Sequence, residues 1–162
     1  MSSVLLGIHI AAGVVGLALG PIVFFSESRR IAGAQPPITG WGAAYHAAVL
    51  TICVSAVLLV IVDRPDLWLL VIVATLSYGL VLMGRIAGAR ALKEGGWSHA
   101  YVHGIAGSYI ALVTALLVVA LTVDGPIRGP AELIPWVLPA AVGTPLIELW
   151  RRHLLSSAAR SG

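Results

Sequence analysis

Three histidines, His46, His99 and His103, are the residues of this chain whose type and spacing are best suited to chemistry. His99 and His103 are four residues apart, which places both side chains on one face of a helix. Imidazole nitrogens bind zinc, copper and iron, and they also transfer protons near neutral pH. All three histidines begin apolar segments, where a polar group is costly unless it has a function or a partner. We therefore treat them as candidate ligands.

The composition places these histidines in a membrane protein. Of 162 residues, 59% are hydrophobic and 10% are charged, whereas a soluble domain averages about 25% charged residues. Apolar segments of about twenty residues are long enough to cross a bilayer as helices. The sequence predicts one all-α transmembrane domain over residues 1–162, a bundle of five transmembrane helices. The expected spans are residues 4–25, 41–62, 67–85, 98–123 and 133–150.

The connections between spans differ in length. Glu27 to Gly40 is expected to be a loop, because it is polar and contains the turn-forming pair Pro36 and Pro37. Residues 63–66 are so short a connection that spans two and three are expected to be antiparallel neighbours.

The fifth span is the least regular of the five in sequence. Pro135, Pro139 and Pro145 fall within it, which predicts a kinked or partly irregular crossing. Glu148 lies near its end, where it is expected to reach toward the membrane surface beside Arg151.

The charged residues predict an orientation. Two of the ten basic residues, Arg64 and Arg128, fall on the side that includes the amino terminus. The other eight fall on the opposite side, and they are Arg29, Arg30, Arg85, Arg90, Lys93, Arg151, Arg152 and Arg160. Because basic loops stay in the cytoplasm, the amino terminus should be outside and the carboxyl terminus cytoplasmic. We expect a bacterial inner (plasma) membrane protein whose basic residues serve topology rather than nucleic-acid binding.

The orientation decides which histidines could meet. His46 and His103 each lie about five residues into a span from the cytoplasmic side, a depth of about 7–8 Å at 1.5 Å per residue. His99 is one turn shallower on the same face as His103. His9 enters from the other side, where it has no histidine partner, and we expect it to have a helix-packing or interfacial role.

The matched depths favour a cofactor between helices two and four, used for electron transfer. His46 and His103 are the predicted ligands of a haem b or of a transition metal, and His99 is a further candidate ligand. Arg85 lies at the same face and could pair with haem propionates. Tyr109 lies deeper, where it could line a pocket for a quinone or a lipid-like molecule.

Alternatives without this cofactor stay open, and the sequence does not decide whether the protein is an enzyme. The histidines could be structural in a non-enzymatic membrane subunit or small transporter. Gly16 and Gly20 could then pack against a second copy or another subunit. A small membrane enzyme acting on a quinone or lipid, with His103 transferring protons, is a further alternative. The sequence has no nucleophile elbow, phosphate-binding glycine loop, CxxC or HExxH.

Four segments resemble a known family. His9 with the glycines of span one, Tyr45-His46, His99 with His103, and Gly107 to Ala115 (Gly-Ser-Tyr-Ile-Ala-Leu-Val-Thr-Ala) are similar to a family of small bacterial multi-pass membrane proteins grouped as a domain of unknown function. The resemblance covers most of spans one to four and implies the architecture, without an activity. The placement of histidines on paired helices is also similar to membrane b-type cytochromes.

Overall fold

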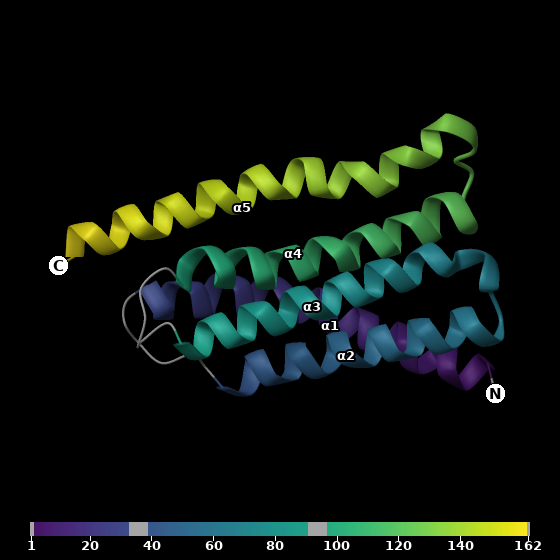
Figure 1. Ribbon diagram of the computed structural model, residues 1–162, viewed down its shortest axis with the longest axis horizontal. Helices are drawn as coiled ribbons and strands as arrows, with labels where there is room; N and C mark the ends of the chain where they lie inside the picture. Colours follow the sequence, from purple (N-terminus) through teal and green to yellow (C-terminus); the bar gives the residue numbers. More distant parts are fainter. Residues whose placement is uncertain (1, 33–38, 91–96, 162) are drawn as a thin grey trace.

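The computed structural model describes residues 2–32, 39–90 and 97–161, and it is all-α (Figure 1). Its five long helices are α1 (Ser2–Ala32), α2 (Thr39–Val62), α3 (Trp68–Arg90), α4 (Trp97–Val118) and α5 (Leu133–Ser161). Three short helical turns lie at their connections: η1 (Pro65–Leu67), η2 (Val119–Val123) and η3 (Gly129–Glu132). The η2 turn is π-helical and continues directly from α4.

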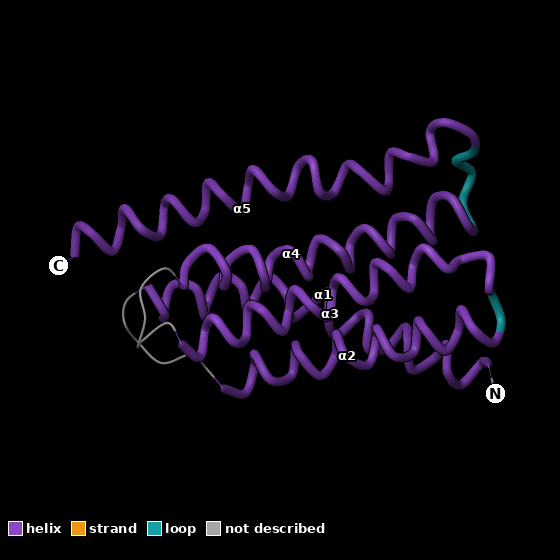
Figure 2. The backbone as a smooth tube through the Cα atoms, in the orientation of Figure 1, coloured by secondary structure: helices purple, strands orange, loops and turns teal. Residues whose placement is uncertain are grey.

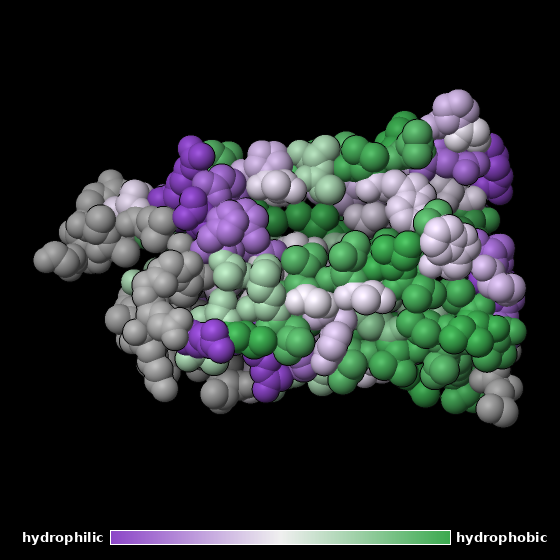
Figure 3. Space-filling view, in the orientation of Figure 1, coloured by the Kyte–Doolittle hydropathy of each residue, from purple (hydrophilic) through white to green (hydrophobic). Residues whose placement is uncertain are grey.

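The predicted membrane architecture is confirmed. Five segments are long and apolar enough to span a membrane: Ser3–Arg30, Gly40–Val62, Pro65–Arg90, His99–Val123 and Gly129–Leu154. Large apolar side chains such as Val14, Ile61, Leu76 and Leu149 are more than half exposed. Figure 3 shows apolar residues over the middle of one face and hydrophilic residues toward both ends. Such a belt is the surface that a multi-pass protein presents to lipid.

Four helices form a ring and the fifth lies outside it. Contacts join α1 to α2, α2 to α3, α3 to α4, and α4 back to α1. Helix α5 packs mainly against α4 and more lightly against α1. Figure 2 shows α5 running beside this group of four. Helix α4 is therefore the central helix, with neighbours on three sides.

The two ends of the bundle carry different charges. Figure 1 shows the carboxyl ends of α1, α3 and α5 and the amino ends of α2 and α4 at one end. We call it the basic end, because its described helices carry Arg29, Arg30, Arg85, Arg90, Arg151 and Arg152. Asp63, Asp66, Asp124 and Glu132 lie at the opposite end. The basic residues thus gather at the end that the sequence predicts to be cytoplasmic, and the orientation itself stays a prediction.

Two local expectations were wrong. Helix α1 continues to Ala32, so Glu27 and Ser28 belong to a helix and are buried, rather than beginning a loop. Their side chains have protein partners, since Tyr101 donates to Glu27 and Trp150 donates to Ser28.

Helix α5 also differs from its prediction. It continues as one helix through Pro139 and Pro145, so the crossing is not partly irregular, and the expected kink stays a prediction. Pro135 lies in the first turn of α5, where a backbone N–H has no partner within the helix in any case. Proline at this position therefore does not interrupt the helix.

The backbones of α3 and α4 come into direct contact. A methyl group added at Gly104 would lie 2.5 Å from the backbone nitrogen of Gly84 and 2.8 Å from the carbonyl oxygen of Leu80. Glycine is therefore required on α4, because its missing side chain lets the two backbones approach. The glycines of α1 also serve internal packing: an added methyl would meet Ile52 at Gly16 and Tyr109 at Gly20. These two glycines face the bundle rather than a second copy.

We predict that Gly104→Ala destabilises the bundle by about 1–3 kcal/mol, the usual cost of overpacking a core. Gly79→Ala is the matched control on α3, because no atom lies within 4 Å of the position its methyl would take. The control should be neutral or slightly stabilising, since alanine favours helices over glycine. Thermal unfolding in detergent measures both variants. Equal melting temperatures for the two variants would contradict the close approach.

Candidate functional site

Two of the predicted histidines meet an acidic residue between α4 and α5. His99, His103 and Glu148 each offer one ligand atom, and these three atoms lie within 4.8 Å of one another. The rings of His99 and His103 stack with their centroids 4.0 Å apart, as expected for residues one helical turn apart. The Nε2 atom of His103 lies 3.9 Å from Oε2 of Glu148. Two imidazoles and a carboxylate form a ligand set used by zinc and non-haem iron sites.

Neighbouring groups orient these candidate ligands. Nδ1 of His103 lies 3.1 Å from the carbonyl oxygen of His99. A carbonyl only accepts, so this hydrogen bond places the proton on Nδ1 and leaves Nε2 available toward Glu148. Arg151 and Arg152 donate to the Glu148 carboxylate at 2.8 Å. Only one of these bonds reaches Oε2, so that oxygen retains a lone pair on the side of His103.

His46 belongs to a different part of the bundle. Within the described residues, no hydrogen bond, ion pair or ring contact joins His46 to His103, and the ring of His46 instead lies 5.6 Å from that of Tyr78 on α3. The reason is rotation about the helix axis. Tyr45 is fully buried and its hydroxyl lies 2.9 Å from that of Ser108 on α4. Since successive residues are about 100° apart around a helix, His46 is turned toward Tyr78 of α3 rather than toward His103.

His46 lines a largely apolar cavity of about 230 Å³ at the basic end, and its polar lining residues are Glu27, Arg85, Tyr101 and His46 itself. The hydroxyl of Tyr101 donates to Oε2 of Glu27 over 3.0 Å. Oε1 of Glu27 and Nδ1 of His46 are buried and have no hydrogen-bond partner among the described residues. The cavity therefore contains two polar atoms that no other described residue satisfies.

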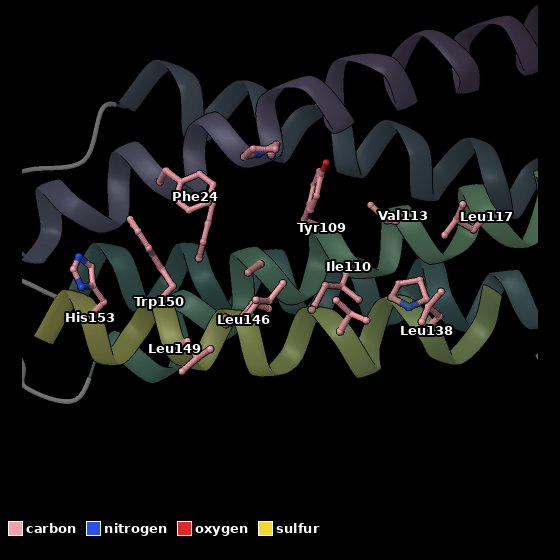
Figure 4. A pocket seen from close by; sticks show the side chains of 18 residues that line it. Phe24, Tyr109, Ile110, Val113, Leu117, Leu138, Leu146, Leu149, Trp150 and His153 are labelled. Carbon is pink, nitrogen blue, oxygen red and sulfur yellow. The ribbon is translucent and has the colours of Figure 1, made fainter. Parts of the chain in front are cut away.

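Tyr109 lies in a third place, an apolar groove of about 910 Å³ between α1, α4 and α5. Figure 4 shows Tyr109 among apolar side chains such as Phe24, Ile110 and Leu146, with Trp150 and His153 further along α5. Its ring packs over Gly20 of α1. The groove runs between helices that contact lipid, and its lining suits an acyl or isoprenoid chain more than a polar solute.

Sequence reasoning missed three polar residues of these sites. Glu148 was expected only to reach the membrane surface, although comparing its depth with that of His103 would have found the pair. Glu27 was placed in a loop because the segment after Phe25 is polar. Tyr101 lies two residues before His103, and a buried tyrosine in a span is a signal for a polar partner.

Comparisons of the chain with protein-family models, with curated proteins and with solved structures find no match. The resemblance to small bacterial membrane proteins therefore stays a prediction.

We predict that Tyr101→Phe destabilises the protein by about 1–3 kcal/mol, because it leaves a buried carboxylate without its donor. Glu27→Gln should recover part of this loss in the Tyr101→Phe background, since a neutral amide is less costly to bury unpaired. A double-mutant cycle of unfolding free energies in detergent measures the coupling. Additive effects of the two substitutions would show that this hydrogen bond does not stabilise the fold.

Proposed function

We propose that this multi-pass membrane protein binds one transition-metal ion between α4 and α5, with His99, His103 and Glu148 as ligands. The observation that carries the proposal is the convergence of their three ligand atoms within 4.8 Å. Metal–nitrogen and metal–oxygen bonds are about 2.0–2.2 Å long. Small side-chain rotations would therefore suffice to bring all three atoms to one ion. His99 is exposed, so an ion can reach the site from the basic end.

The surrounding groups support a metal site more than a simple ion pair. Metal-bound histidines usually donate their second nitrogen to a carbonyl, as His103 does to His99. Metal-bound carboxylates are usually held by further donors, as Glu148 is by Arg151 and Arg152. Three protein ligands leave at least one coordination position open. Iron or copper bound there would supply one-electron chemistry, which agrees with the electron-transfer role predicted from the sequence.

The proposal predicts about one metal ion per chain in full-length protein purified in mild detergent. His99→Ala, His103→Ala and Glu148→Gln should each weaken binding at least about tenfold, because each removes one ligand of three. Elemental analysis gives the stoichiometry. Titration with Zn²⁺ against a competing chelator gives the affinity of each variant.

His46→Ala is the matched control, because it removes a histidine at the same end that contacts Tyr78 instead of the cluster. It should leave the affinity for Zn²⁺ unchanged. An absorption spectrum of the same preparation separates the two cofactor hypotheses. A Soret band lost in both His46→Ala and His103→Ala would contradict the proposal and favour haem ligated by that pair. Unchanged Zn²⁺ affinity in His103→Ala would also overturn it.

A further inference from the structure

The cavity that His46 lines at the basic end lies apart from the proposed metal ligands and contains an acidic and a basic side chain. Glu27 is 5% exposed, and its Oε1 atom has no donor among the described residues. Arg85 lines the same cavity and is exposed. No ion pair joins Arg85 to Glu27 within the part of the chain that the structure describes. Among the described residues, Arg85 therefore does not neutralise Glu27 by direct contact.

An unpaired buried carboxylate is expensive, and in a membrane protein it usually indicates a ligand or ion site. Among the described residues, the hydroxyl of Tyr101 is the side-chain donor to Glu27, and the backbone N–H of Gly42 also interacts with its carboxylate. Gly42 leaves room for the other oxygen, since a methyl added there would lie 2.7 Å from Oε1. His46 adds a second unsatisfied atom, Nδ1, to the same cavity.

We propose that this cavity binds a small zwitterion with an ammonium group, a carboxylate and a compact apolar side chain. The ammonium group donates to Oε1 of Glu27. The carboxylate accepts from the guanidinium of Arg85 and from Nδ1–H of His46. Each charged or unsatisfied group of the cavity then has a partner, and the ligand supplies the bridge that Glu27 and Arg85 do not form directly.

The size and lining of the cavity define the ligand further. A volume of about 230 Å³ corresponds to about eight non-hydrogen atoms at ~30 Å³ per water-sized group. Val23, Val81 and Ile105 supply an apolar part of the lining. An amino acid with a short branched side chain satisfies both conditions, and L-valine is the probe that we choose.

This inference is independent of the metal site. Tyr101 and His103 both lie on α4, but the cavity and the metal cluster share no residue. A solute cavity that begins at one end of a helical bundle is a feature that a small transporter requires, so the inference supports that alternative function. Binding of L-valine and binding of Zn²⁺ can be measured separately on the same preparation, and either can fail alone.

Isothermal titration calorimetry of the full-length protein in detergent tests the proposal with three probes. L-valine carries both charges, isobutylamine lacks the carboxylate, and 3-methylbutanoate lacks the ammonium group. We expect one L-valine to bind per chain, and we expect each of the other two probes to bind with at least tenfold lower affinity. Equal affinity for isobutylamine and L-valine would overturn the zwitterion assignment. The absence of any heat of binding when L-valine is titrated to 10 mM would also overturn it.

Two variants locate the ligand in the cavity. Glu27→Gln should lower the affinity for L-valine at least tenfold. Arg85→Gln should abolish the preference for L-valine over isobutylamine. Glu132→Gln is the matched control, because it neutralises an acidic residue at the opposite end, and it should bind L-valine as the parent does. Arg85 is exposed, so its variant is expected to fold even if Glu27→Gln does not. Unchanged L-valine affinity in folded Glu27→Gln, or an unchanged preference in Arg85→Gln, would overturn the proposal.

Discussion

The close approach of α3 and α4 is the constraint on which the rest of the bundle depends. At Gly84 and Gly104 the two backbones come so near that no side chain fits between them. In a bilayer, helices gain little from hiding apolar surface, so such small-residue contacts are what hold them together. Fixing α4 against α3 also fixes its rotation, and this rotation decides which residues face α1, α2 and α5.

The polar contacts of α4 follow from that rotation. Ser108 faces α2 and pairs with Tyr45, while Tyr101 faces α1 and pairs with Glu27. His103 faces α5 and lies near Glu148. Each contact places a polar pair inside or beside the membrane region, where unpaired groups are costly. The three pairs therefore specify how the neighbouring helices are arranged, and they also create the places where chemistry can occur.

The sequence was sufficient for the architecture because the length and hydropathy of each segment determine whether it spans a membrane. It was also sufficient for the shared face of His99 and His103, which depends only on helical spacing, and for the packing role of His9, which contacts Ser55. It was insufficient for the partner of His103. Depth along a helix can be counted from the sequence, but rotation about the axis depends on tertiary contacts such as that of Tyr45.

The two carboxylates at the basic end show how different surroundings give one residue type two uses. Glu148 is partly exposed and bound by two arginines, so it is held in place and can add a metal as a further partner. Glu27 is buried, with Tyr101 as its side-chain donor and no partner for Oε1 among the described residues, so that oxygen favours a ligand that brings its own positive charge. Tyr101 and His103 are about 200° apart around α4. The two sites therefore lie on opposite sides of one helix, so one can be occupied without displacing a residue of the other.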